Sequence, residues 1–209
     1  MYRLISATPS PYARKVRIAL LEKGVPFELV TEVPWNSDSE TPRWNPLEKL
    51  PVLITPDGTS VFESRYVLEW IEIKHSEPPL APKNADDLLA MKRYEVIADG
   101  ACDALVLVFI ERSRAQPSAE WTARQTRKAD GALRELAASI GGREFCVGGR
   151  LTYADLAVAS LLGWLRVRLP DYGWERTHPN LVAYSDRLEL RPSFRSTVPS
   201  AQVIRDRVA

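Results

Sequence analysis

The pattern of the sequence changes at a proline-rich segment, SEPPLAPKNA at residues 76–85, and this change constrains the fold more than any other feature. Before it, short β-rich runs alternate with helical patterns, whereas after it apolar residues recur only at helical spacing. Proline and small polar residues are typical of a stiff linker rather than of a packed element. We therefore predict a first domain at residues 1–76, a linker at 77–85 and an all-helical second domain at 86–209.

The first domain has the element order of a thioredoxin-like fold. Pro56-Asp57-Gly58 is a hairpin signal, because Gly accepts the positive φ that the turn requires, and its flanking strands should be antiparallel. Ser10 caps one helix, which Gly24 ends, and Ser64 caps another. The predicted strands are 2–5, 27–33, 52–55 and 59–62, and irregular structure is expected at 34–50. The order β-α-β-loop-β-β-α predicts a mixed four-stranded sheet.

The second domain is predicted to be a helical bundle. Thr152 and Asp155 form a capping-box pattern, in which the acidic side chain reaches back to the start of the helix. The helix that they begin is apolar on nearly every side, which is typical of the centre of a bundle. The other helical patterns lie at 88–114, 129–140 and 178–190, with a short final helix after Arg191-Pro192. The fold class is therefore α/β plus all-α.

Charge and cysteine content exclude several function classes. With 28 basic and 27 acidic side chains the net charge is +1, so no long-range field attracts nucleic acid or an anionic membrane. The N-terminus has no signal-peptide pattern and the longest apolar run, residues 104–110, is too short to span a bilayer, so we expect a cytoplasmic protein. Cys102 and Cys146 lie far apart, and His75 and His178 are isolated, which predicts two buried thiols and no metal.

Four motifs in a fixed order point to a known family. They are Ser10-Pro11-Tyr12-Ala13-Arg14-Lys15-Val16-Arg17-Ile18-Ala19-Leu20, Lys49-Leu50-Pro51-Val52, Phe62-Glu63-Ser64-Arg65 and the cap from Thr152 to Asp155. Together they resemble a glutathione S-transferase over essentially the whole chain, of the serine type found in tau-like and related bacterial members. The resemblance implies that glutathione is the co-substrate and that the helical domain selects a hydrophobic electrophile.

The resemblance implies that Ser10 is the catalytic hydroxyl. The pKa of a free thiol is about 8.5, so little of it is thiolate at neutral pH. A hydroxyl hydrogen bond and a helix N-terminus would both stabilise the thiolate, and lowering the pKa by roughly 2 units takes about 2.7 kcal/mol. Judged by local sequence alone, Ser10 also fits a simple helix cap, and Thr8 is the nearest competing hydroxyl.

Further residues are assigned to the two ends of glutathione. The resemblance implies that the backbone of Leu50, before a cis Pro51, pairs with the cysteinyl part, and that Glu63 and Ser64 receive the γ-glutamyl end. Lys49 is a candidate for the glycyl carboxylate. The alternatives are an ordinary cap for Ser64 and a surface lysine for Lys49.

Family geometry suggests an electrophile pocket between the two domains. Its candidates are Tyr12, Tyr94, Asp103, Val106, Trp164 and Arg168. Aromatic and aliphatic residues at helical spacing fit a core as well as a pocket, and Arg168 fits either binding of anionic acceptors or a charge at a helix C-terminus. The resemblance also implies a homodimer, with Arg65, Tyr66 and Arg93 near the contact.

Conjugation of glutathione to an electrophile is the leading functional hypothesis. Disulfide reduction would need a nucleophilic cysteine where the sequence has Ser10, and Ala13 leaves no resolving thiol. A glutathione-dependent peroxidase is an alternative, because glutathione itself can attack the peroxide. A second alternative is a non-catalytic binding protein with the same fold, although a scaffold has no need for residues that bind both ends of the tripeptide.

Overall fold

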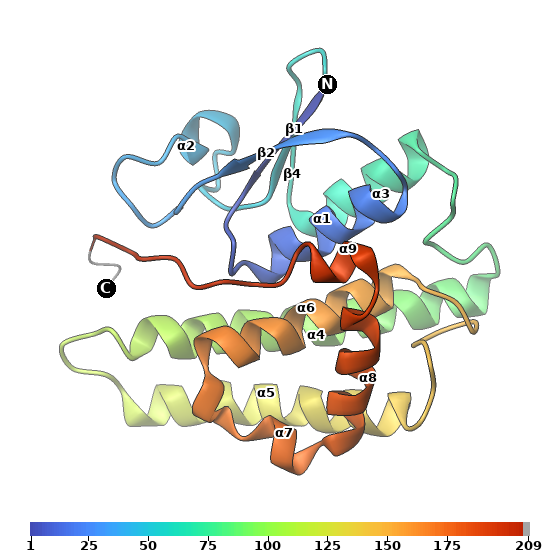
Figure 1. The fold of residues 1–209 in the computed structure, drawn as a ribbon. Helices are drawn as coiled ribbons and strands as arrows, with labels where there is room; N and C mark the ends of the chain where they lie inside the picture. Colours follow the sequence, from blue (N-terminus) through green and yellow to red (C-terminus); the bar gives the residue numbers. More distant parts are fainter. Residues whose placement is uncertain (207–209) are drawn as a thin grey trace.

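A four-stranded sheet and a block of long helices form the two layers of the protein (Figure 1). The computed structural model describes residues 1–206. In the first layer the elements are β1 (Tyr2–Ser6), α1 (Pro11–Glu22), β2 (Phe27–Thr31), α2 (Thr41–Trp44), β3 (Val52–Ile54), β4 (Ser60–Phe62) and α3 (Ser64–Lys74). The strand order is β2-β1-β3-β4, with β1 and β2 parallel and the other pairs antiparallel. The predicted mixed sheet and its hairpin are confirmed.

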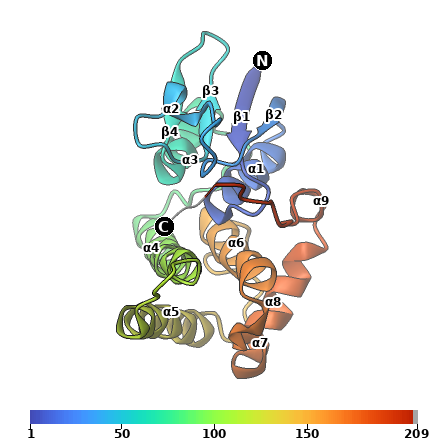
Figure 2. The same ribbon diagram turned by 90° about the vertical axis from the view of Figure 1, so that its left-hand side faces the viewer.

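The pleat of the sheet divides its side chains between two faces. Leu4, Leu53 and Val61 belong to the main core, which also contains buried residues of α1 and α3. Their neighbours Ile5 and Val52 belong to a smaller cluster that Trp44 of α2 packs against. This alternation is the period of two expected for a strand. Within the first layer, α1 and α3 cover the face of the sheet that is turned toward the helical block (Figure 2).

Three predictions for the first layer need correction. β2 ends at Thr31 and not at Val33, shortly before Pro34, whose missing N–H cannot extend a ladder. The segment 34–50, expected to be irregular, contains the single-turn helix α2, which is too short to show periodicity. Ser64 is the first residue of α3 rather than its cap, a position that Glu63 occupies.

The helical block begins with two long helices. Its elements are α4 (Ala85–Glu111), α5 (Ala119–Ile140), α6 (Tyr153–Arg168), the 3-10 turn η1 (Pro170–Tyr172), α7 (Trp174–Thr177), α8 (Pro179–Glu189) and α9 (Pro192–Arg195). Asn84 caps α4 by accepting from the N–H groups of Asp86 and Asp87 at 2.9 and 3.1 Å. η1 and α7 were not predicted, because each is a single turn. The segment predicted to be a linker is held against α1. Lys23, at the end of α1, donates to the carbonyls of His75 and Pro78.

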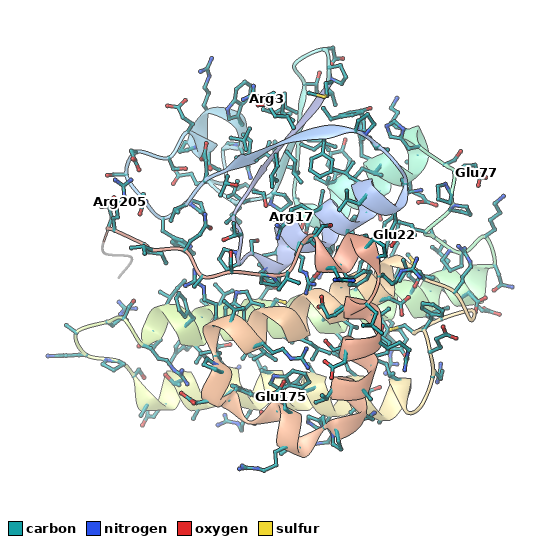
Figure 3. All side chains as sticks on the ribbon, in the orientation of Figure 1. Arg3, Arg17, Glu22, Glu77, Glu175 and Arg205 are labelled. Atoms are coloured by element: carbon teal, nitrogen blue, oxygen red, sulfur yellow. The ribbon has the colours of Figure 1, made fainter. Side chains whose placement is uncertain are left out.

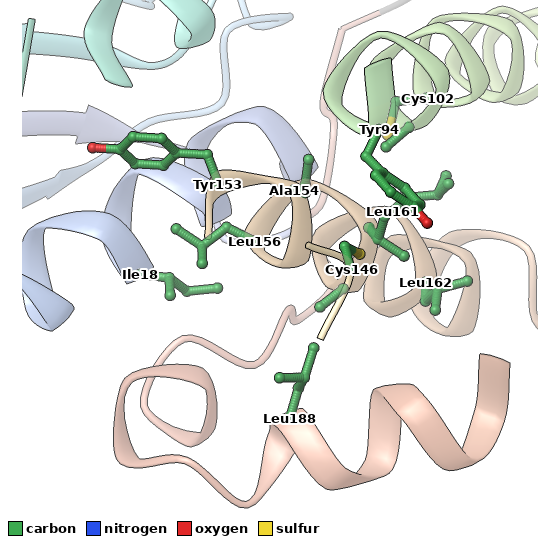
Figure 4. Close-up of a cluster of buried hydrophobic side chains, with 14 of the residues drawn as sticks. Ile18, Tyr94, Cys102, Cys146, Tyr153, Ala154, Leu156, Leu161, Leu162 and Leu188 are labelled. Carbon is green, nitrogen blue, oxygen red and sulfur yellow. The ribbon is translucent and has the colours of Figure 1, made fainter. Parts of the chain in front are cut away.

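The centre of the block is α6, as its apolar composition predicts. Every residue from Tyr153 to Leu165 is buried. Figure 4 shows several of them within the core. The capping box is present, with the Thr152 N–H 2.8 Å from an Asp155 carboxylate oxygen. Cys102 and Cys146 are both free and buried, and burial raises the pKa of each thiol well above its usual value. The expectation of two buried thiols is confirmed.

The chain after α9 crosses from the helical block to the sheet layer. Residues 197–206, which we call the strap, have no helix or strand and run between the layers (Figures 1 and 2). At one end Pro199 is buried close to Gly163 of α6. At the other end Arg205 pairs with Asp38 at 2.5 Å. The strap therefore connects elements from both layers next to the start of α1.

Candidate active site

Ser10 lies in the turn between β1 and α1, at the edge where the two layers meet. It is the cap of α1, with Pro11 as the first helical residue, and its Oγ accepts from the Ala13 N–H at 3.2 Å. The hydroxyl proton has no acceptor among residues 1–206, and the residue is only partly buried. A hydroxyl can accept and donate at once, so the capping role leaves a donor available at the N-terminus of a helix.

Thr8, the competing hydroxyl, is already engaged by the strap. Its Oγ1 donates to the carbonyl of Ser200 at 2.8 Å, and its backbone N–H donates to the side-chain oxygen of Gln202 at 3.0 Å. These bonds fix the turn that precedes Ser10. They also commit the Thr8 proton, so the geometry favours Ser10 as the free donor.

The peptide bond between Leu50 and Pro51 is cis, as predicted. Neither the N–H nor the carbonyl of Leu50 makes a hydrogen bond within residues 1–206. The antiparallel register of β1 and β3, with Ile5 opposite Val52, brings Leu50 alongside the end of β1 and so near the turn that holds Ser10. The unpaired backbone of Leu50 can therefore hydrogen-bond to an extended peptide.

Lys49 and Glu48 form the outer side of this edge. The buried side chain of Asn45 donates to the Lys49 carbonyl at 2.7 Å, while the Lys49 side chain is exposed. Glu48 has a φ of 55°, in the left-handed region. The loop is thus held by its backbone, and the ammonium group of Lys49 stays in solvent.

The junction of β4 and α3 has an unusual backbone. Glu63 has φ 71° and ψ 115°, a conformation that is unfavourable for a residue other than glycine. No side chain caps α3, and its first intrahelical bond runs from the Val67 N–H to the Glu63 carbonyl. The N–H groups of the first turn are open, and the buried Ser64 hydroxyl lies 3.4 Å from the Glu63 carboxylate. Open N–H groups at a helix start favour an anion.

A buried ionic cluster connects α1, α3 and α4 behind these two helix starts. Lys15 Nζ lies 2.8 Å from both carboxylate oxygens of Asp99, and Arg65 Nε lies 2.7 Å from one of them. Lys15 and Asp99 are buried. Removing either partner would leave the other charge unpaired in a low dielectric, so the cluster fixes the N-termini of α1 and α3 relative to one another.

Two residues predicted for the electrophile side, Tyr12 and Asp103, are in contact. The Tyr12 hydroxyl donates to the Asp103 carboxylate at 2.5 Å, which brings α1 and α4 together beside Ser10. Burial raises the pKa of Tyr12, with a further contribution from that carboxylate, so the phenol stays protonated. Val106 follows one turn later on α4 and is partly buried.

Two further candidates, Tyr94 and Trp164, are buried in the core. Tyr94 lies near Cys102 and Leu161 (Figure 4), and the ring of Trp164 is edge-on to Phe109. Both side chains pack in the core, and their place in the electrophile pocket stays a prediction. Arg168 is the last residue of α6, and its guanidinium lies 4.9 Å from the centroid of the Phe109 ring.

Two features near the site have no counterpart in the sequence-based prediction. Arg17 is 5% exposed and donates to the Thr8 carbonyl at 3.3 Å; burial, aided by the charge of Arg14, lowers its pKa to about 10 (Figure 3). The sequence contains a signal for this burial, because Arg14, Lys15 and Arg17 lie close together on α1. A helix packed on both sides cannot direct all of these charges to solvent. The second feature is Gln202 in the strap. The strap has no helical or strand periodicity, so the sequence contains no signal for this residue.

Comparisons with known proteins identify the family of this chain. Residues 9–74 match the family model "Glutathione S-transferase, N-terminal domain", and residues 119–187 match its C-terminal counterpart. YibF of Escherichia coli K12, described as an uncharacterized GST-like protein, is 34% identical over 94% of this chain and 98% of that protein. The chain belongs to the glutathione S-transferase family. This family member has its predicted glutathione residues at the edge between its two layers.

Solved structures show the same fold with ligands. A glutathione S-transferase from Methylobacterium radiotolerans, in complex with glutathione sulfonate, is 60% identical with a TM-score of 0.97, and the match covers 100% of this chain and 99% of that one. A family member from Pseudomonas fluorescens is 30% identical with a TM-score of 0.80, over 95% of this chain and 100% of that one. The latter contains S-(propanoic acid)-glutathione.

Three other observations concern this family member. A hollow of about 440 Å³, lined by residues that include Tyr2, Gly24 and His75, lies near the N-terminus and contains none of the predicted site residues. Within residues 1–206 no group of three or more His, Cys, Asp or Glu side chains is placed to hold a metal ion. No helix in that range is long and apolar enough to cross a membrane.

Proposed function

We propose that this protein binds glutathione at the edge formed by Ser10, Leu50 and Glu63, and transfers it to an electrophilic small molecule. The observation that carries the proposal is the free hydroxyl proton of Ser10 at the N-terminus of α1. The unpaired backbone of Leu50 lies beside the same turn. The glutathione ligands of the two solved relatives support a tripeptide at this place.

In this proposal the catalytic step is nucleophilic attack by a thiolate. The Ser10 hydroxyl donates to the sulfur, and the positive end of the α1 dipole lowers the pKa of the thiol, whose proton passes to water. The sulfur then forms a C–S bond at the electrophilic carbon, and the leaving group departs with the bonding electron pair. Holding both reactants next to one another supplies much of the remaining rate.

The two ends of the tripeptide are bound by separate groups. The Glu63 carboxylate pairs with the γ-glutamyl ammonium, while the Ser64 hydroxyl and the open N–H groups of α3 bind the adjacent carboxylate. The ammonium of Lys49, whose side chain is exposed, pairs with the glycyl carboxylate in this proposal. Tyr12, Asp103 and Val106 line the electrophile side.

Ser10→Ala tests the mechanism. Loss of a charge-assisted hydrogen bond of about 1.5–3 kcal/mol should lower kcat/KM by about 10- to 100-fold and raise the pKa of bound glutathione, with little change in glutathione affinity. The pKa is measured from the ultraviolet absorbance of the thiolate. Thr8→Val removes a hydroxyl that already donates its proton to the Ser200 carbonyl of the strap. This variant should therefore leave the pKa of bound glutathione nearly unchanged.

A substrate panel separates the alternatives. Chlorinated aromatics, epoxides, isothiocyanates and a hydroperoxide are assayed with both the wild type and Ser10→Ala. Turnover of the hydroperoxide alone would indicate a peroxidase. Glutathione binding without any Ser10-dependent turnover would contradict the proposed transfer and leave a binding protein.

We also propose a homodimer in the cytoplasm. Tyr66 and Ile73 on α3, and Leu89 and Val96 on α4, are exposed apolar residues at helical spacing on two helices joined by the ion pair of Glu69 and Lys92. Such a pair of faces is suited to a two-fold contact. Arg65 and Arg93 lie on the same helices. A monomeric mass in light scattering would contradict the dimer.

A further inference from the structure

Arg168 is a cation without an acidic partner. Its Nη1 and Nη2 both lie 3.4 Å from a single acceptor, the carbonyl oxygen of Gln202, and none of residues 1–206 offers it an ion pair. Arg166, two positions earlier on α6, pairs with Glu175 and Asp186 at 2.8 Å. Partial burial lowers the pKa of Arg168, because no carboxylate offsets the loss of solvent.

The side chain of Arg168 makes no hydrogen bond to the end of its own helix. Its guanidinium reaches the strap rather than the last carbonyl groups of α6, and it stacks on Phe109 of α4. The two long bonds to one carbonyl leave the other N–H groups of the guanidinium without an acceptor among residues 1–206. An arginine held by stacking, with free donors, is preorganised to bind an anion.

The same residue lies close to the proposed electrophile pocket. Gln202, whose carbonyl accepts from Arg168, also accepts the Thr8 N–H on its side chain, so one glutamine separates Arg168 from the turn before Ser10. Phe109, beneath the guanidinium, is six residues beyond Asp103, about 9 Å along α4. The Asp103 carboxylate beside Tyr12 would repel an anion at that end of α4, which leaves the Arg168 end for an anionic group.

We propose that Arg168 binds an anionic group of the electrophile, and that the substrates of this protein are apolar electrophiles with a carboxylate remote from the reacting carbon. This inference rests on the transferase function proposed above. The reacting carbon lies at the sulfur near Ser10, the apolar part of the substrate lies along Tyr12 and Val106, and the carboxylate replaces the Gln202 carbonyl on the guanidinium. A bidentate pair is stronger than the two long bonds it displaces.

Two matched electrophiles test the substrate class. 4-(Chloromethyl)benzoate and its methyl ester differ only in the charge at the end remote from the benzylic carbon. In each reaction the sulfur forms a C–S bond at that carbon and chloride leaves with the electron pair. Relative to the uncatalysed rates, wild-type kcat/KM should favour the acid by about 10-fold or more, with most of the difference in KM.

Binding of the two conjugates tests the residue independently of turnover. In calorimetry the acid conjugate should bind wild type about 10-fold tighter than the ester conjugate, and salt should reduce the difference. Arg168→Gln should abolish the difference without changing affinity for glutathione, Arg168→Lys should retain part of it, and Arg166→Gln, the matched control, should keep it.

Each outcome is decisive. Equal wild-type binding of the two conjugates, or a preference that survives Arg168→Gln, overturns the anion site while Ser10-dependent turnover can still stand. If Arg168→Gln does not fold, the test is the effect of salt on how much tighter the wild type binds the acid conjugate than the ester conjugate. A difference in affinity that salt does not reduce overturns the proposal. A wild type that binds no glutathione contradicts the proposed function and the anion site together.

Discussion

At the scale of a single residue, the backbone of Glu63 is more costly than local structure requires. Its φ of 71° and ψ of 115° cost about 1–3 kcal/mol for a residue with a Cβ. The side chain caps no helix N–H and is exposed, so stability does not explain a glutamate at this position. The proposed pairing with the ammonium group of glutathione accounts for it, because the strained backbone directs a carboxylate beside the open start of α3.

Glu63→Gly should therefore separate stability from binding. Glycine relieves the strain, and we expect the free energy of unfolding to rise by about 1 kcal/mol, measured by urea denaturation. We expect the KM for glutathione to rise about 10-fold, since a charge-assisted bond is lost. Glu63→Gln keeps the strain and should raise KM without the gain in stability. A Glu63→Gly protein that binds glutathione normally would remove this residue from the site.

At the scale of elements, the contact between α1 and α6 depends on a glycine. Arg14 of α1 is fully buried, and it donates to the Ala159 carbonyl of α6 at 3.3 Å and to Glu189 at 2.7 Å. A Cβ at Gly163 would overlap the Arg14 guanidinium and lie 3.3 Å from Pro199 of the strap. Because these bonds hold the arginine from several sides, it cannot move aside without losing them.

Gly163→Ala should thus destabilise the protein in spite of the higher helix propensity of alanine. We expect the free energy of unfolding to fall by about 1–3 kcal/mol, as for overpacking in a core. The matched control is Gly100→Ala in α4, where nothing lies within 4 Å of the added carbon, and it should stabilise by about 1 kcal/mol. Equal effects at the two glycines in thermal unfolding would refute the close contact.

At the scale of the whole molecule, what could be predicted from the sequence is what local chemistry determines. The hairpin at Gly58 and the cap at Thr152 follow from interactions within a few residues, and the family resemblance supplied the cis bond before Pro51. The strap could not be predicted, because Gln202 bonds to Glu32, 170 positions away, and its segment has no periodicity. For the same reason the sequence left two interpretations open for Arg168, whose acceptor is in the strap.

The strap couples the two layers at the site, and Gln202→Ala tests this coupling. The Thr8 N–H would lose its acceptor, so its hydrogen exchange should accelerate about 10-fold, while the free energy of unfolding falls by only about 1 kcal/mol. Arg195→Ala, at an exposed residue with no side-chain bond within residues 1–206, serves as the control. Unchanged exchange at Thr8 would show that the turn before Ser10 is rigid without the strap. Accelerated exchange would mean that the strap helps to hold the turn before Ser10, the residue proposed to be catalytic.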